Sequence, residues 1–244
     1  MRDLIEAHFK EAKESNDPDI INSLLIELGK NPSEEYLRFI DYLMNNLEEE
    51  IYKKIELNLI YAIGEFGYLL SLKENYLQFL YQTYYKSDRW IRNEIIQTID
   101  KISKNAKLNN EIYKLIGNAL RDDYNPIKIN ALKTMMNIEI SDLILYNLLF
   151  VLNSKDSEVL EACRRTLEII PLDSRKLFKT LDNDGNYKIL KLRGIRFLLL
   201  TFFQSIIKLE DFRNSVENSD WEIDYKEKYL KELDTLERIL IKNM

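Results

Sequence analysis

The chain has 244 residues, of which 45% are hydrophobic and 31% are charged, and its formal net charge is −6. It is therefore too apolar to be disordered, and its 6 Gly and 4 Pro are too few for a loop-rich β-sandwich or a collagen-like rod. A single Cys and a single His exclude a disulfide scaffold, an iron–sulfur cluster and two-His zinc motifs, so we expect no cofactor and no metal.

The hydrophobic residues are also dispersed in a way that excludes membrane spans. No run of about 18 uncharged apolar residues is present, and Met1-Arg2-Asp3 is not followed by the apolar region of a secretory signal. We therefore expect a cytoplasmic protein without a membrane partner. Residues 1–50 carry 5 basic and 13 acidic side chains, whereas residues 51–207 carry 23 and 18. Because the whole chain is acidic, nucleic acid is a poor candidate partner.

A repeat follows the first predicted helix, residues 3–13. Six segments share an apolar anchor residue and have mostly apolar residues four and eight positions later, which is one stripe of an α-helix. The segments are Ile20–Gly29, Ile55–Gly64, Ile91–Asp100, Ile127–Met136, Val159–Glu168 and Leu192–Thr201. Shorter helices are predicted between them, at Glu35–Leu47, Glu74–Tyr85, Glu111–Leu120, Leu143–Leu152 and Ser174–Leu181. The unit is a helical hairpin of about 35 residues, which has to stack on its neighbours to bury its apolar face.

Three positions within the repeat need separate interpretation. In the sixth segment Arg196 falls at a position that is apolar in the other five, so the register of this unit is the weakest. Gly64 and Gly67 lie in one helix, where each costs about 1 kcal/mol relative to alanine, and they suggest a close approach of another helix. Cys163 takes the small position of its unit, and we expect a buried structural thiol.

The starts of three repeated helices resemble a known family. Asp88-Arg89-Trp90-Ile91-Arg92, Asn125-Pro126-Ile127-Lys128 and Asp156-Ser157-Glu158-Val159 look like the beginning of the second helix of a HEAT repeat. The resemblance covers residues 1–207. It implies an all-α, right-handed α–α superhelix, a HEAT-like solenoid of about six hairpins with second helices lining a concave face, and it implies no enzymatic activity.

Residues 208–244 differ from the repeat, and we expect capping or docking helices there. Ser219 and Asp220 can cap a helix that runs to about Lys242, with one apolar face and one highly charged face. Such a helix suits the end cap of a solenoid. The alternative is a helix through which the chain forms an oligomer or docks on a larger assembly.

The candidate binding surface lies at offsets 2, 6 and 9 from the anchors, which point away from the buried stripe. Apolar residues such as Leu57 and Ile129 at these offsets suit protein recognition, unless they pack against adjacent units. The best candidate contacts are Tyr61, Trp90, Asn93, Gln97, Lys133 and Arg165. We expect a non-enzymatic scaffold or adaptor that binds another protein, with an immunity or inhibitor protein as a specific form.

One enzymatic alternative comes from a second resemblance. Some DNA alkylation repair glycosylases look like six-unit HEAT-like solenoids that use aromatic residues and a carboxylate against a damaged base. Trp90 and Glu94 lie one helical turn apart here, but the match is limited to these two residues and the family pattern has Asp. The sequence isoelectric point of about 5.2 also disfavours binding to a DNA groove.

Overall fold

The computed structural model describes residues 2–203 and 206–242, and within them the chain is all-α. Residues 1, 204–205 and 243–244, which belong to the predicted repeat and C-terminal segments, lie outside the described residues. Two compact units divide the chain, Met1–Leu115 and Ile116–Met244, with the boundary inside one helix. The division predicted between residues 207 and 208 separates the repeats from the C-terminal helices and does not concern compact units. It stays a prediction.

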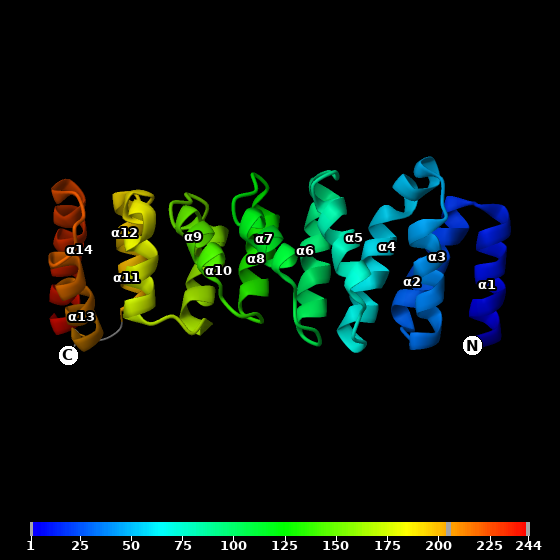
Figure 1. Ribbon diagram of the computed structural model, residues 1–244, viewed down its shortest axis with the longest axis horizontal. Helices are drawn as coiled ribbons and strands as arrows, with labels where there is room; N and C mark the ends of the chain where they lie inside the picture. Colours follow the sequence, from blue (N-terminus) through cyan, green and yellow to red (C-terminus); the bar gives the residue numbers. More distant parts are fainter. Residues whose placement is uncertain (1, 204–205, 243–244) are drawn as a thin grey trace. The chain divides into compact units, whose positions relative to one another are not determined.

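The first unit contains three helical hairpins, which follow one another in chain order (Figure 1). Its elements are α1 (Arg2–Ser15), α2 (Pro18–Lys30), the 3-10 helix η1 (Glu34–Tyr36), α3 (Leu37–Asn45), α4 (Glu49–Leu69), α5 (Glu74–Tyr84) and α6 (Arg89–Ser103). The second helices α2, α4 and α6 pack against one another from repeat to repeat.

The second unit continues the same alternation of first and second helices. It begins within α7 (Asn110–Ala119) and contains α8 (Asn125–Met135), α9 (Asp142–Val151), α10 (Ser157–Ile169), α11 (Ser174–Asp182), the 3-10 helix η2 (Asn183–Lys188), α12 (Leu192–Phe202), α13 (Ile206–Glu217) and α14 (Ile223–Lys242). The second helices α8, α10, α12 and α14 contact one another in order, and α11 contacts both α9 and α13. All twelve helices predicted for residues 3–201 are confirmed.

Aspartate side chains cap the N-termini of several second helices. The carboxylates of Asp17, Asp88 and Asp156 accept hydrogen bonds from backbone N–H groups in the first turns of α2, α6 and α10. A cap of this kind satisfies donors that the helix itself leaves free and stabilises the helix by about 1 kcal/mol. The starts of these helices, and therefore the height of each side chain along them, are fixed locally.

The predicted apolar stripe forms the core in the first five repeats. The residues four and eight positions after each anchor are all buried. They are Leu24 and Leu28, Leu59 and Ile63, Ile95 and Ile99, Ala131 and Met135, and Cys163 and Leu167. The Cys163 thiol has a pKa raised to about 12 by burial, which agrees with an unreactive structural cysteine.

Buried threonines link each of two second helices to the one before it. Thr98 lies seven positions after its anchor, and its Oγ1 donates to the carbonyl oxygen of Ile60 in the preceding second helix at 3.0 Å. Thr166 occupies the equivalent position and donates to the carbonyl oxygen of Leu132, also at 3.0 Å. In both cases the acceptor lies five positions after its own anchor. The repeat is thus held by a regular polar contact as well as by apolar packing.

The predicted register of the sixth repeat is wrong by one residue. Leu192 and Leu200, the predicted core positions, are 49% and 47% exposed, whereas Ile195 and Leu199 are buried. The equivalent anchor is therefore Lys191, at the start of α12. Its backbone N–H donates to Asn153 Oδ1 at 2.8 Å, so a side chain from the previous repeat fixes where this helix begins.

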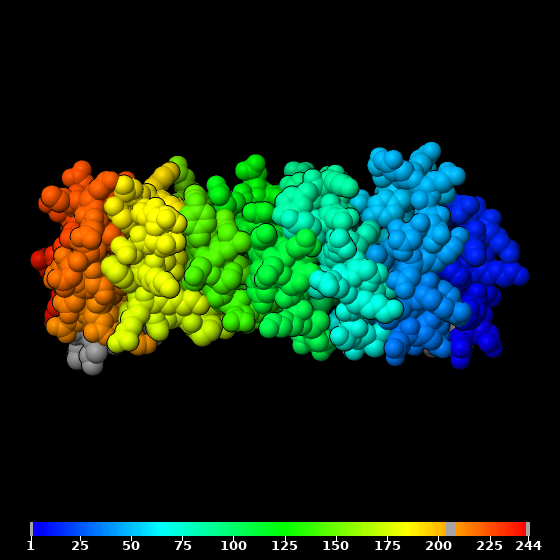
Figure 2. All heavy atoms as spheres, in the orientation of Figure 1, coloured from blue at the N-terminus to red at the C-terminus, as the bar shows by residue number. Residues whose placement is uncertain are grey.

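The last hairpin, α13 and α14, packs on the sixth repeat in the same way as the earlier hairpins pack on one another. Helix α14 contacts α12, and α13 contacts α11. In Figure 2 α13 lies in front of α14, whose C-terminal atoms show only at the edge. The predicted apolar residues Tyr229, Leu233 and Leu236 of α14 are buried within this unit, as a cap requires. Trp221 precedes the helix and stacks on Tyr187, with ring centroids 4.5 Å apart. An oligomer through α14 stays a prediction.

A buried ion pair takes the place of the threonine contact in this last repeat. Glu232 lies seven positions after Tyr225, where Thr98 and Thr166 lie in their repeats, and it is 5% exposed. Its carboxylate accepts from Arg196 Nε at 2.8 Å and from Arg196 Nη2 at 2.9 Å. With the corrected register, Arg196 lies five positions after Lys191. The arginine that interrupts the apolar stripe in the sequence therefore serves the link between repeats.

No helix in the described part of the chain is long and apolar enough to cross a membrane. The turn at Asp184 and Gly185 has φ values of 51° and 71°, and the glycine adopts this left-handed conformation at little cost. Among the described residues, no group of His, Cys, Asp or Glu side chains is arranged to hold a metal ion.

Candidate functional site

A groove between α8 and α10 is lined by several residues of the predicted binding surface. It has a volume of about 640 Å³, and its lining includes Ile129 and Lys133 from α8, Met136 directly after that helix, and Ala162 and Arg165 from α10. Ile129, Lys133 and Met136 are the offset 2, 6 and 9 residues of their repeat. The groove therefore has an apolar floor, with one cation contributed by each helix at the same height.

The acidic side chains beside this groove are mostly neutralised by arginines. Glu161 accepts bonds from Arg164 Nη2 at 2.8 Å and from Arg165 Nε at 2.9 Å. These two bonds, that from Arg164 first, lower the pKa of the Glu161 carboxyl to about 2. Arg164 also pairs with Glu168 at 2.6 Å. Glu158, in the first turn of α10, is the other carboxylate of the groove, where the helix dipole favours it.

The candidate residues of the first unit lie on α4 and α6. Tyr61 is half-buried, and the ammonium of Lys101 lies 4.8 Å from its ring centroid, a cation–π contact. Lys101 also pairs with Glu65 at 2.8 Å. Asn93 and Gln97 are half-buried on α6. Tyr61 therefore already has an internal partner, whereas Lys133 of the groove between α8 and α10 has none among the described side chains.

Trp90 lies at the first turn of α6 and is 57% exposed. Its backbone N–H donates to the capping carboxylate of Asp88 at 2.8 Å, and the guanidinium of Arg89 lies 5.1 Å from its ring centroid. An aromatic side chain of this size at a helix start offers a large apolar contact area to a partner.

Glu94 is the carboxylate on which the glycosylase alternative depends. It is half-buried on α6, and its pKa is raised by that burial, with Lys101 opposing the shift and Glu65 adding to it. A raised pKa makes the ionised carboxylate a stronger base than an ordinary glutamate, but burial raises the pKa of structural carboxyls in the same way. This environment gives the glycosylase alternative no support beyond the two residue types.

The Glu94→Gln variant is expected to be more stable than the parent near neutral pH. Because the folded-state pKa of Glu94 is raised, the native protein loses stability as the pH rises through it, while the unfolded carboxyl is already ionised. Melting temperatures are measured at about pH 4 and pH 7.5; we expect a gain on the order of 2 °C at pH 7.5 and none at pH 4. An equal difference at both pH values would show that the carboxyl charge is not the cause.

The structure brings together some of the predicted contacts and leaves others separate. Lys133 and Arg165 line one groove, and Tyr61, Asn93 and Gln97 occupy neighbouring helices of the first unit. Sequence reasoning missed Ala162, which lies at offset 3 rather than 2. It also missed Phe197 and Leu200 as surface candidates, because the register of α12 was wrong; the corrected register places them at offsets 6 and 9.

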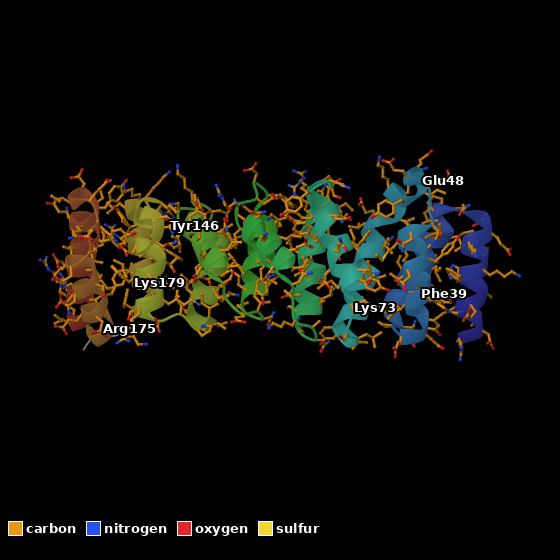
Figure 3. The ribbon with its side chains drawn as sticks, viewed as in Figure 1. Phe39, Glu48, Lys73, Tyr146, Arg175 and Lys179 are labelled. Atoms are coloured by element: carbon orange, nitrogen blue, oxygen red, sulfur yellow. The ribbon has the colours of Figure 1, made fainter. Side chains whose placement is uncertain are left out.

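A second groove in the same unit lies outside the predicted binding surface. It has a volume of about 580 Å³ and lies between the first helices α9 and α11, lined by Tyr146 and Lys179 among others. Figure 3 labels both residues together with Arg175, which is also on α11. Arg175 and Lys179 are exposed cations, so they match Arg165 and Lys133 in charge and secondary structure but lie on first helices.

Comparison with known proteins defines the fold. No family model and no curated protein matches the sequence. The crystal structure of an engineered protein is similar, with a TM-score of 0.55 and 14% identity over 95% of this chain and 96% of its own. A designed armadillo repeat protein in complex with the peptide (KR)4 has a TM-score of 0.46 and 13% identity, over 95% of this chain and 97% of its own. The chain is an all-α helical repeat protein of the solenoid class.

Proposed function

We propose that this chain is a HEAT-like, non-enzymatic module that binds another protein through the exposed surface of its second helices. The observation that carries the proposal is the groove between α8 and α10. There Ile129, Met136 and Ala162 form an apolar floor beside two exposed cations, Lys133 and Arg165. Apolar surface flanked by polar groups is typical of protein recognition sites.

The first unit supplies a second part of the proposed surface. Leu57 and Trp90 are both exposed, on α4 and α6. Tyr61, Asn93 and Gln97 accompany them at the predicted offsets. When a partner covers large aromatic and aliphatic side chains, burial of their apolar surface stabilises the complex by about 25 cal/mol per Å².

Inhibition of the bound partner, as an immunity protein inhibits its toxin, is one specific form of this function. Its support is the size and acidity of the chain. The discriminating observation is a partner whose activity falls when the complex forms. The glycosylase alternative is tested separately, by release of a methylated base from duplex DNA and its loss in Trp90→Ala and Glu94→Gln. We expect no release and no DNA binding at low salt.

Photo-crosslinking tests the proposed surface directly. A photoreactive amino acid is placed at Ile129 in the full chain and, as a control, at Tyr146, and crosslinked proteins from the native lysate are identified by mass spectrometry. The dissociation constant of the purified partner is then measured. The double charge reversal Lys133→Glu, Arg165→Glu is expected to weaken binding about tenfold or more, mostly through faster dissociation.

The matched control is Arg175→Glu, Lys179→Glu, which makes the same charge change on first helix α11. It is expected to leave the dissociation constant unchanged, and both variants should keep the melting temperature of the parent because all four side chains are exposed. Equal effects of the two double variants, or no effect of either, would show that the partner does not use this groove.

A further inference from the structure

The groove between α8 and α10 also indicates the chemistry of what it binds. Lys133 and Arg165 each lie six positions after their anchors, Ile127 and Val159, so the two cations stand at one height on neighbouring second helices. Ile129 lies one turn before Lys133, and Met136 lies one turn after it. An occupant therefore meets two cations at one level and apolar side chains above and below.

The hydrogen-bonding capacity of the two cations is largely unused. Within residues 2–203 and 206–242, the structure gives the Lys133 side chain no ion pair or hydrogen bond, and it gives the Arg165 side chain only the bond from its Nε to Glu161. The terminal nitrogens of the Arg165 guanidinium and the Lys133 ammonium are thus donors that face solvent. A carboxylate is the acceptor that matches such donors best, because charge-assisted bonds are about twice as strong as neutral ones.

The acidic residues near the groove limit how much negative charge the occupant carries. Arg164 binds both Glu161 and Glu168, and Glu161 engages Arg165 at Nε alone, so the terminal nitrogens of Arg165 and the Lys133 ammonium stay available to an occupant. Glu158 lines the opposite end of the groove, near Ser157 at the start of α10, and it would repel a second acid there. The charge pattern suits a single carboxylate at the level of Lys133, not a run of acids.

We propose that the groove binds a segment of a partner protein in which one Asp or Glu side chain adjoins an aliphatic residue. The carboxylate pairs with Lys133 and Arg165, and the aliphatic side chain covers Ile129 and Ala162. This inference rests on the proposed function and specifies the partner segment that the groove accepts. A polyacidic segment and a basic segment are both excluded by the same charges.

Selection from a random peptide library tests this specificity. Phage-displayed dodecapeptides are selected in parallel on the full chain, on the Lys133→Glu, Arg165→Glu variant and on the Arg175→Glu, Lys179→Glu variant. We expect the parent and the α11 variant to enrich peptides with an acid beside Leu, Ile, Val or Met. The groove variant should lose these peptides and enrich peptides with Lys or Arg at the acid position.

Affinities of synthetic peptides then separate the two proposals. An enriched peptide, acetylated and amidated so that it has no terminal charge, should lose about tenfold in affinity when its acid becomes the amide. Groove-dependent binding without this loss overturns the inference about the carboxylate and leaves the proposed function intact. Binding that neither Lys133→Glu nor Ile129→Ala weakens counts against the groove itself.

Two further outcomes also overturn the inference. The first is a failure to enrich any peptide above an unrelated protein, since the groove would then not accept short segments; crosslinking still tests the function. The second is self-association of the full chain that Lys133→Glu, Arg165→Glu abolishes, measured by light scattering. That result would make the occupant a second copy of this chain.

Discussion

Replacing Gly67 by alanine is expected to destabilise the protein by about 1–3 kcal/mol, although alanine is the better helix former by about 1 kcal/mol. Gly67 lies in α4 against Ile102 of α6. A Cβ at Gly67 would overlap Ile102 Cγ1 and lie 3.0 Å from Leu72 Cδ1. Ile102 is fully buried, so it has little room to move, and the cost of overpacking exceeds the gain in helix propensity.

Urea unfolding of four variants measures this effect: Gly67→Ala, Ile102→Ala, the two combined, and Gly117→Ala. Gly117→Ala is the matched control, because the nearest atom to its new Cβ would be the end of the Asn147 side chain, at 3.0 Å, and the next contacts are ordinary ones; we expect a change within about 1 kcal/mol. In Gly67→Ala, Ile102→Ala the new methyl group enters the space that the isoleucine leaves, so the loss should be smaller than the sum of the two single losses. Full additivity would show that the two residues do not compete for space.

The second large effect is expected at the ion pair between Arg196 and Glu232. Arg196→Met should lower the melting temperature by several degrees, because it leaves the buried carboxylate of Glu232 without its guanidinium. Arg196 is 57% exposed, so water screens part of the interaction and the loss is smaller than for a fully buried pair. Glu232→Gln should cost less, since the amide oxygen still accepts a bond.

The double variant Arg196→Met, Glu232→Leu distinguishes a structural link from net stabilisation. Removing both charges leaves no buried group unpaired, and apolar replacements of a buried pair are often neutral. We expect it to recover most of the stability that Arg196→Met loses, in thermal unfolding at neutral pH. A double variant as unstable as Arg196→Met would mean that the guanidinium contributes through packing of its stem.

Most of the fold could be predicted from the sequence because its information is local and repeated. Aspartate residues that can cap a helix, together with the apolar stripe, identify the second helices. Because the stripe recurs at Ile55, Ile91 and Ile127, an irregular residue in one unit does not hide the pattern. The prediction fails in the sixth unit because a residue of the previous repeat determines where its second helix begins. Asn153 fixes the start of α12. Gly194 lies so close to Asn153 and to the backbone carbonyl of Leu152 that a side chain at this position would be crowded.

The candidate site was less accessible to sequence reasoning than the fold. Offsets identify Lys133 and Arg165 as facing away from the core, but only coordinates show that they share a groove. The role of Arg196 needs Glu232, 36 residues away, and no local pattern connects them. Which acids are already neutralised, as Glu161 is, likewise depends on side-chain geometry.

The two kinds of link between second helices differ in how freely each could change by mutation. Thr98 and Thr166 donate to main-chain carbonyls, and every amino acid at positions 60 and 132 presents that same oxygen. A substitution there would leave the contact in place. The link to the last hairpin needs a donor side chain at position 196 and an acceptor side chain at position 232, so what is tolerated at one position depends on the other.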